Sequence, residues 1–226
     1  MSRPRVIAVV PSAGYGKRLG LKKKKPFVLL GGKPIASYAL KTLGDCPAID
    51  GIIIAAEEPC IKHFKRLIDR YAIRKVIDVV VGGRTRAESV RNCLDAVGAS
   101  FDIVLIHDAA RPFVDRALIE KSIKLAAQFG GCIAALEESD TVKLADENLF
   151  IKKTLDRNFI FRAQTPQAFR YGIIKRAYAA CRDFDNFTDD ASLAEAMGIK
   201  VRIVKGSCRN IKITTKEDLK LAEVLL

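Results

Sequence analysis

Short, almost wholly apolar runs recur along the chain and alternate with stretches in which apolar residues follow a helical spacing. Such runs are typical of strands buried on both faces of a parallel sheet. The predicted buried strands cover residues 6–10, 51–56, 76–81, 103–106 and 132–136. The predicted helices cover residues 34–43, 59–71, 86–96 and 115–129. Because crossovers between parallel strands are right-handed, we expect an α/β fold with a mostly parallel sheet and helices on both faces.

This pattern changes after Ser139. Residues 141–163 have no helical stripe, contain a turn-like run at 146–148 and alternate at Phe159 and Phe161, so we predict a hairpin excursion. Helices resume at 172–182 and 189–196, followed by a strand at 201–204. The last helix is predicted to begin with a capping box formed by Thr214 and Glu217. We find no repeat and no linker, and therefore expect one domain over residues 1–226.

Composition narrows the class of protein. The 226 residues are 49% hydrophobic, which is enough for one large core. The longest apolar runs are far shorter than the roughly 20 residues of a membrane span, and the first residues lack the apolar region of a signal peptide. Six cysteines are scattered without a C-x-x-C pair, which disfavours a disulfide framework or a structural zinc site. We expect free thiols in a soluble, cytoplasmic protein.

The formal charge of +13 indicates anionic partners, either a small polyphosphate or nucleic acid. The basic residues are spread along the chain, there is no Trp, and no aromatic stacking motif is evident. These features disfavour general nucleic-acid binding. A basic nucleic-acid-binding module on a similar scaffold nevertheless stays open as an alternative.

A glycine-containing loop follows the first predicted strand, in "VVPSAGYGKRLGLKKKKPF" at residues 9–27. A Walker A loop would require a glycine where Pro11 stands and a hydroxyl where Arg18 stands. A dinucleotide fingerprint would require G-x-G-x-x-G, whereas the glycines here give G-x-G-x-x-x-G, which also disfavours a nicotinamide oxidoreductase. The loop therefore follows neither of the two common phosphate-binding patterns.

The same loop nevertheless suits a phosphate chemically. Small residues let backbone N–H groups approach an anion closely, and Arg18 and Lys25 would add charge-assisted contacts. We expect Lys22, Lys23 and Lys24 to be solvated instead. The small residues concerned are Ser12, Ala13, Gly14 and Gly16.

Eight sequence blocks follow one another from about residue 5 to the C-terminus: "PSAGYGKRL", "KKPF", "GGRTRAESV", "HDAARPF", "SDTVK", "TLDRNFIFRAQTPQAF", "TDDASL" and "GSCRNIKITTKEDLKLAEVLL". Taken in this order, they resemble the 2-C-methyl-D-erythritol 4-phosphate cytidylyltransferases of non-mevalonate isoprenoid synthesis. The resemblance implies a single Rossmann-like nucleotidyltransferase domain, usually a homodimer, with a protruding β-arm at about 141–163. It also implies that CTP and methylerythritol phosphate react, with Mg²⁺, to give CDP-methylerythritol and pyrophosphate.

The resemblance also implies roles for individual residues. Arg18, Lys25 and Lys212 would be the catalytic cations, and Asp108 would lie near both the ribose and the metal. The nucleotide would contact Ser12, Ala13, Gly14, Gly16, Gly82, Gly83, Ser89, Asp108 and Ala109. Methylerythritol phosphate would contact Arg111, Thr141, Arg157, Thr165 and Thr188, with Arg157 and Thr165 serving the neighbouring subunit's site.

The chain departs from the family pattern at two places. Pro26 stands where Gln often follows the lysine of the first loop, and Arg84 and Thr85 stand where an acidic residue can follow the paired glycines. A pentitol-phosphate cytidylyltransferase, acting on ribitol 5-phosphate, would share the first loop and "NIKITT", but "HDAARP" and "TDDAS" favour the methylerythritol substrate.

Several of these residues also have purely structural explanations. Asp108 follows a buried strand at the carboxyl edge of the sheet, where ligands of open α/β sheets bind, but it could equally cap a turn. Ser89 and Thr188 stand where hydroxyls cap helices. His107 has no nucleophile or carboxylate motif beside it, so we expect a packed strand residue.

Overall fold

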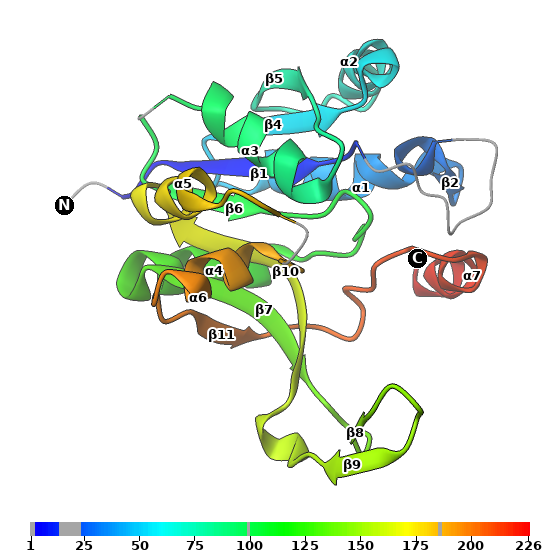
Figure 1. The fold of residues 1–226 in the computed structure, drawn as a ribbon. Coiled ribbons are helices and arrows are strands. Elements are labelled where there is room, and N and C mark those ends of the chain that lie inside the picture. Colours follow the sequence, from blue (N-terminus) through cyan, green and yellow to red (C-terminus); the bar gives the residue numbers. More distant parts are fainter. Residues whose placement is uncertain (1–2, 14–23, 99, 185–186) are drawn as a thin grey trace.

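The computed structural model describes residues 3–13, 24–98, 100–184 and 187–226. Its central sheet has seven strands in the order β11-β7-β10-β6-β1-β4-β5 (Figure 1). The neighbours pair in parallel except around β10, which pairs antiparallel with both β6 and β7. The strands are β1 (Val6–Pro11), β4 (Gly51–Ala56), β5 (Val76–Val81), β6 (Ile103–Ile106), β7 (Gly131–Glu137), β10 (Phe161–Arg170) and β11 (Arg202–Lys205).

Helices cover both faces of this sheet, as the pattern predicts. Along β1 the side chains alternate: Val6, Ala8 and Val10 join one buried cluster, and Ile7 and Val9 join another. The first cluster is completed by α1 (Ile35–Asp45), α2 (Ile61–Arg70) and α4 (Arg116–Phe129). The second is completed by α3 (Arg86–Ala96), α5 (Tyr171–Ala180) and α6 (Asp190–Ala196). The mixed α/β fold with a mostly parallel sheet is therefore confirmed.

Two features of the sheet were not predicted correctly. The run at 76–81 forms β5, but β5 is the edge strand, and Ile77 and Val81 are 61% and 49% exposed. An apolar run does not reveal whether a second neighbour pairs with the strand, and the prediction that β5 is buried was wrong. Strand β10 was also missed, because Gln164, Thr165 and Gln167 break the apolar run where the strand is most buried.

The last helix, α7 (Lys216–Leu225), begins one residue later than predicted. The Thr215 hydroxyl accepts a hydrogen bond from the Asp218 amide, and the Asp218 carboxylate accepts one from the Thr215 amide. The sequence offers two overlapping capping boxes, and the fold uses Thr215 with Asp218 instead of Thr214 with Glu217. Thr214 is thereby left beside the cavity described below.

A third, small hydrophobic cluster packs α7 against the short hairpin of β2 (Leu29–Leu30) and β3 (Lys33–Pro34) and against the start of α1. It places Ile213 and Ala222 against Val28, Leu30 and Ile35. A 3-10 turn at Lys25–Phe27, labelled η2, leads into this cluster, and Lys212 immediately precedes Ile213. Packing in this cluster therefore brings the segments that carry Lys25 and Lys212 together, and both lysines line the same cavity.

The predicted excursion is an arm that projects from one end of the sheet (Figure 1). Strands β8 (Lys143–Ala145) and β9 (Ile151–Thr154) pair antiparallel, and every residue of both is exposed. A 3-10 turn at Arg157–Phe159, labelled η4, links β9 to β10, and another at Glu58–Cys60, labelled η3, precedes α2. Among the described residues, no helix has the length and hydrophobicity needed to cross a bilayer.

Candidate active site

A cavity of about 420 Å³ opens at the carboxyl ends of β1 and β6. Four basic side chains, those of Lys25, Arg84, Arg86 and Lys212, line it, whereas Asp108 is the one acidic side chain among its described lining residues. This excess of positive charge suits a polyanion such as a triphosphate. The other lining residues are Pro11, Ser12, Ala13, Pro26, Ile35, Gly83, Thr85, Ser89, Ala109, Ala110 and Thr214.

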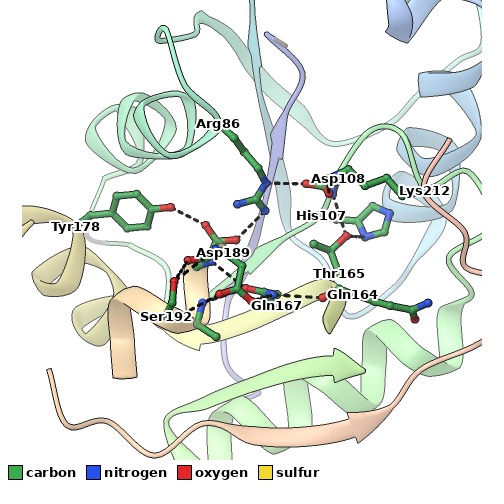
Figure 2. Close-up of polar contacts among 12 residues, drawn as sticks. Arg86, His107, Asp108, Gln164, Thr165, Gln167, Tyr178, Asp189, Ser192 and Lys212 are labelled. Atoms are coloured by element: carbon green, nitrogen blue, oxygen red, sulfur yellow. Dashed lines mark hydrogen bonds and ion pairs between the residues drawn. The ribbon is translucent and has the colours of Figure 1, made fainter. Parts of the chain in front are cut away.

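Asp108 is the electrostatic centre of this cavity (Figure 2). One carboxylate oxygen, Oδ1, accepts from Arg86 Nε at 2.8 Å, and the other, Oδ2, lies 2.7 Å from Lys212 Nζ. Burial alone would raise the pKa of this carboxyl, but the charges of Arg86 and Lys212 outweigh burial and hold it well below its usual range. Asp108 is therefore an anion at every physiological pH, fixed between two cations.

The backbone of Asp108 is held by Thr165 on β10. Its amide donates to Thr165 Oγ1 at 3.1 Å, and the same hydroxyl lies 3.1 Å from His107 Nδ1. The other ring nitrogen, Nε2, lies 3.1 Å from the Arg111 carbonyl, which can only accept, so the neutral ring carries its proton on Nε2 and Nδ1 accepts from Thr165. Burial lowers the pKa of His107 to about 4. The expectation of a packed strand histidine fits this geometry.

Arg86 reaches beyond Asp108 to a second carboxylate. Its Nη2 donates to Asp190 Oδ2 at 2.7 Å, and Tyr178 donates to Asp190 Oδ1 at 2.6 Å. The amides of Asp190 and Ala191 both donate to Gln167 Oε1 at 3.1 Å. These bonds connect the start of α6 to α3 through Arg86, to α5 through Tyr178 and to β10 through Gln167.

The turn at Gly82 and Gly83 closes one side of the cavity. A Cβ added at Gly82 would overlap Ala13, and one at Gly83 would overlap Glu88, so close packing requires glycine at both positions. The Ser89 hydroxyl accepts from the Gly83 amide at 3.1 Å and donates to the Thr85 carbonyl at 2.9 Å. Ser89 therefore shapes this turn with both of its hydrogen-bonding functions.

The departures at Arg84 and Thr85 have a local structural role. The Thr85 side chain accepts from the Glu88 amide and caps α3. The Arg84 amide and guanidinium both donate to the Glu88 carboxylate, at 2.6 and 3.1 Å, and these bonds lower the pKa of Glu88. An acidic side chain thus lies at this turn after all, contributed by α3 instead of the loop.

Ser12 and Ala13 line the cavity where β1 ends. The Ser12 amide donates to the Ala55 carbonyl at 2.7 Å, while the Ser12 hydroxyl oxygen is buried and has no hydrogen-bond partner among the described residues. Such a group usually has a ligand or water as its partner. Gly14, Gly16 and Arg18, which were predicted to hold phosphate, lie outside the described residues.

The predicted acceptor residues are not gathered in this cavity. Thr165 and Arg111 are buried, and Arg111 donates to the Asn210 carbonyl at 2.8 Å. Thr188 lines a neighbouring cavity of about 210 Å³. Thr141 and Arg157 lie on the arm, and both are exposed, with Arg157 donating to the Ser139 carbonyl at 2.8 Å.

Four residues of this network were not singled out from the sequence. They are Arg86, Gln167, Tyr178 and Asp190. Arg86 and Asp190 belong to the blocks "GGRTRAESV" and "TDDASL", but spacing could not show that two segments 104 residues apart meet in an ion pair. Tyr178 follows the ordinary helical stripe of α5, and only its hydroxyl distinguishes it from a core residue.

Comparison with known proteins supports one family. The family model described as IspD, 2-C-methyl-D-erythritol 4-phosphate cytidylyltransferase, matches residues 6–226. Curated proteins of that name from Syntrophotalea carbinolica and Clostridium tetani are 44% and 43% identical, covering 98% and 96% of this chain and 96% and 88% of their own. The crystal structure of 4-diphosphocytidyl-2C-methyl-D-erythritol synthase from Anaerococcus prevotii is 30% identical, with a TM-score of 0.87 over 98% of this chain and 95% of that one.

Proposed function

The chain belongs to the 2-C-methyl-D-erythritol 4-phosphate cytidylyltransferase family, and from that premise we propose that the cavity around Asp108 is its nucleotide site. The protein is a nucleotidyltransferase that transfers the cytidylyl group of CTP to 2-C-methyl-D-erythritol 4-phosphate, a reaction of isoprenoid synthesis. The products are CDP-methylerythritol and pyrophosphate. The observation that carries the assignment of the cavity is its four basic side chains gathered around a single carboxylate.

The chemistry requires no general base. A phosphomonoester oxygen of the acceptor is already ionised at neutral pH, and it attacks the α-phosphorus of CTP while the bond from that phosphorus to the bridging oxygen of the β-phosphate breaks. The electron pair of that bond leaves with pyrophosphate. The barrier comes from bringing two anions together, so fixed cations are the main requirement. The neutral, fully hydrogen-bonded His107 has no part in proton transfer.

In our proposal, Lys25 and Lys212 supply these cations, and Arg18 supplies a third. Lys212 is held on Asp108 and is also partly exposed to the cavity. A triphosphate brings several negative charges, so it competes with the single Asp108 carboxylate for this ammonium group. We infer that Lys212 moves from Asp108 to the phosphates when CTP binds.

A magnesium ion would bind beside Asp108. Magnesium is commonly held by one or two carboxylates together with substrate phosphates, and a carboxylate oxygen can accept more than one partner. Asp108 stays ionised and can therefore contribute an oxygen while it keeps its bond to Arg86. No cluster of three or more acidic, His or Cys side chains suited to a metal occurs among the described residues, which fits an ion held mainly by phosphate oxygens. When bound, the ion would withdraw charge from those oxygens.

The base and ribose would lie along the turn at Gly82 and Gly83, with Ser89 holding the turn and Ser12, Ala13 and Ala109 closing the floor. For the acceptor we propose Thr188 on this chain, and Thr141 and Arg157 contributed by the arm. Thr165 and Arg111 would act on the acceptor only through the neighbours that they hold.

We also propose a homodimer formed through the arm. Leu149, Phe150 and Phe159 on the arm are 85%, 72% and 79% exposed, which is unusual for large apolar side chains on a short segment. A second copy would cover them and bring Arg157 to the partner's cavity. The six free cysteines fit a reducing compartment such as the cytoplasm, where we propose that the enzyme works.

The assignment is tested by measuring pyrophosphate release with each of the four nucleoside triphosphates, with and without methylerythritol phosphate, and with ribitol 5-phosphate in its place. We expect release only when CTP and methylerythritol phosphate are both present. Equal rates with UTP, or a preference for ribitol 5-phosphate, would contradict the assignment.

A further inference from the structure

Arg86 lines both of the cavities described above, those of about 420 and 210 Å³. The larger cavity holds Lys25, Asp108 and Lys212, and the smaller one holds Thr188 and Asp189. Thr85 and Arg86 line both of them. The proposed nucleotide site and the cavity that holds Thr188 are therefore neighbours that share Arg86.

This guanidinium is held by two carboxylates of the protein itself. It donates to Asp108 on one side and to Asp190 on the other, at 2.8 and 2.7 Å. Two carboxylates offset its charge, so it is a weaker phosphate ligand than the partly exposed Lys212. Its geometry suits a bridge between two fixed anions, because the planar guanidinium group offers donors in several fixed directions.

The far end of the bridge is rigid. Asp190 is completely buried, and its second oxygen accepts from Tyr178 at 2.6 Å. Its amide and that of Ala191 are held by Gln167, which is itself buried and also donates to Asp189 at 2.7 Å. Figure 2 shows Tyr178, Gln167 and Asp189 around the end of the Arg86 side chain that points away from Asp108. Both carboxylate oxygens of Asp190 thus have a donor, Arg86 on one side and Tyr178 on the other.

Such a network is a poor way to stabilise a core. Replacing a buried ion network by apolar residues is often neutral or stabilising, so stability alone does not explain the three charged groups here. The network connects the end of β6, which carries Asp108, to the beginning of α6, two residues after Thr188.

We propose that Arg86, locked by Asp190 and Tyr178, is a positioning residue that fixes the Asp108 carboxylate relative to the start of α6 and so sets the alignment of nucleotide and acceptor. This inference rests on the proposed function, because it assumes that CTP occupies the larger cavity. It assigns to Arg86 the alignment of two substrates instead of binding to either one.

Two variants test the proposal, each with a matched control. Arg86→Lys keeps the charge but cannot hold two carboxylates with one planar group, and Arg74→Lys makes the same change at the exposed pair with Asp45. Tyr178→Phe removes one hydroxyl and keeps the packed ring, and Tyr171→Phe does the same on α5, where the hydroxyl donates to the Val97 carbonyl. Circular dichroism and thermal unfolding first establish that each variant is folded.

We expect Arg86→Lys to lower kcat by about tenfold or more while the KM for CTP changes by less than about threefold, because alignment is lost but charge is kept. Tyr178→Phe is expected to lower kcat by about threefold, since Asp190 loses one of its anchors. Both controls should retain wild-type kcat. A purely structural role predicts lower thermal stability with unchanged kcat per folded molecule.

Hydrogen exchange in the free protein separates this proposal from the proposed function. The amides of residues 187–196 should exchange faster in Arg86→Lys than in the wild type, with no substrate present. If the wild-type protein transfers no cytidylyl group, the proposed function fails while the exchange comparison still tests the bridge. Should Arg86→Lys fail to fold, Tyr178→Phe supplies both readouts. Unchanged exchange, or wild-type kcat in both variants, would overturn the positioning role.

Discussion

The cavity around Asp108 and the projecting arm carry the proposed catalytic groups in opposite ways. At the cavity, Asp108 is buried, and Arg86, Lys212 and Thr165 hold it in place. On the arm, the described polar contact of Arg157 is a single hydrogen bond to the Ser139 carbonyl, and the side chain is exposed. The cavity is organised within one chain, whereas the arm presents its residues outward.

This difference separates two kinds of site residue. A group that must neutralise a transition state works best when it is fixed beforehand, because reorganising it during the reaction would cost free energy. A group that binds a second molecule or a second copy can stay exposed until that partner arrives, at the cost of ordering it then. Substitutions in the two regions should therefore differ in size and in the step that they affect.

The largest effect is expected at the cavity. Lys25→Ala removes a proposed catalytic cation, and by the magnitude typical of one preorganised donor we expect kcat to fall by about 10²-fold or more. The unfolding temperature of Lys25→Ala is measured beside kcat, so that a loss of turnover is told apart from a loss of folded protein. The measurement is pyrophosphate release at saturating substrates.

Lys24→Ala is the matched control. Lys24 immediately precedes Lys25 in the chain. It does not line the cavity, and its Nζ lies 2.6 Å from Glu57 Oε2. Partly exposed ion pairs of this kind contribute little to stability. Because Lys24 does not line the cavity, we expect the kcat of Lys24→Ala to stay within about twofold of the wild type. Equal losses in both variants would mean that general positive charge, not a fixed lysine, matters here.

The next largest effect is that of His107, next to Asp108, on the stability of the protein, and this effect depends on pH. Burial lowers the pKa of His107 to about 4 in the folded protein, whereas an unfolded histidine has a pKa of about 6.5. Between these values the unfolded chain binds a proton that the folded chain does not, so stability falls as pH falls. Across the pH range between these two pKa values, the free energy of unfolding falls by roughly 3 kcal/mol.

Urea unfolding at pH 7.5 and pH 4.5 measures this contribution. In His107→Gln, which cannot titrate but can still donate to the Arg111 carbonyl, the loss of stability on acidification should be clearly smaller than in the wild type. His63→Gln, on the exposed face of α2, should behave like the wild type. The depressed pKa of Asp108 acts at lower pH, because its stabilisation is present above about pH 4 and is lost only below that value.

The sequence predicted features that depend on neighbouring residues well, and features that depend on contacts between distant segments poorly. The buried strands β1, β4 and β6 were predicted because their apolar runs are local and both faces are covered. The same rule failed for β5, since the absence of a second neighbouring strand is not a local property. Asp108 was predicted to lie at the carboxyl edge of the sheet from its place after β6, and it lines the cavity there. Asp190 was not singled out, because its partner Arg86 lies far away in the sequence.

A smaller effect is expected on the arm. Arg157→Ala removes a proposed contact to the acceptor phosphate, and the loss of one charge-assisted hydrogen bond corresponds to about a tenfold rise in the KM for methylerythritol phosphate. The unfolding temperature should hardly change, because Arg157 is exposed. Steady-state kinetics with each substrate varied in turn separates the two KM values.

Mixing variants tests whether Arg157 serves the partner's cavity. If it does, a mixture of Arg157→Ala and Lys25→Ala chains that exchange subunits recovers up to about a quarter of wild-type sites, because each mixed dimer has one site with both residues intact. If Arg157 serves its own cavity, the mixed dimers have one site lacking only Arg157 and one lacking only Lys25, and no intact site forms. No gain above the two separate preparations would therefore assign Arg157 to its own chain.

The smallest effect concerns a strained residue at the tip of the arm. Leu149 has a φ of +65°, in the left-handed region that favours glycine, and its side chain is 85% exposed. The turn is otherwise well formed, since Asp146 accepts from the amides of Asn148 and Phe150. Leu149→Gly should therefore stabilise the turn by up to about 1 kcal/mol, measured as slower hydrogen exchange across residues 143–154.

Leu144→Gly is the control of opposite sign, because Leu144 is half-exposed in β8 and a glycine within a strand should speed exchange. Neither change should alter kcat, since both residues lie outside the cavity. If Leu149→Gly also weakens self-association, measured by sedimentation at decreasing concentration, then the strained turn presents a leucine to the partner copy. Slower exchange with unchanged association would instead leave the contact between copies to Phe150 and Phe159, and faster exchange would contradict the strain argument itself.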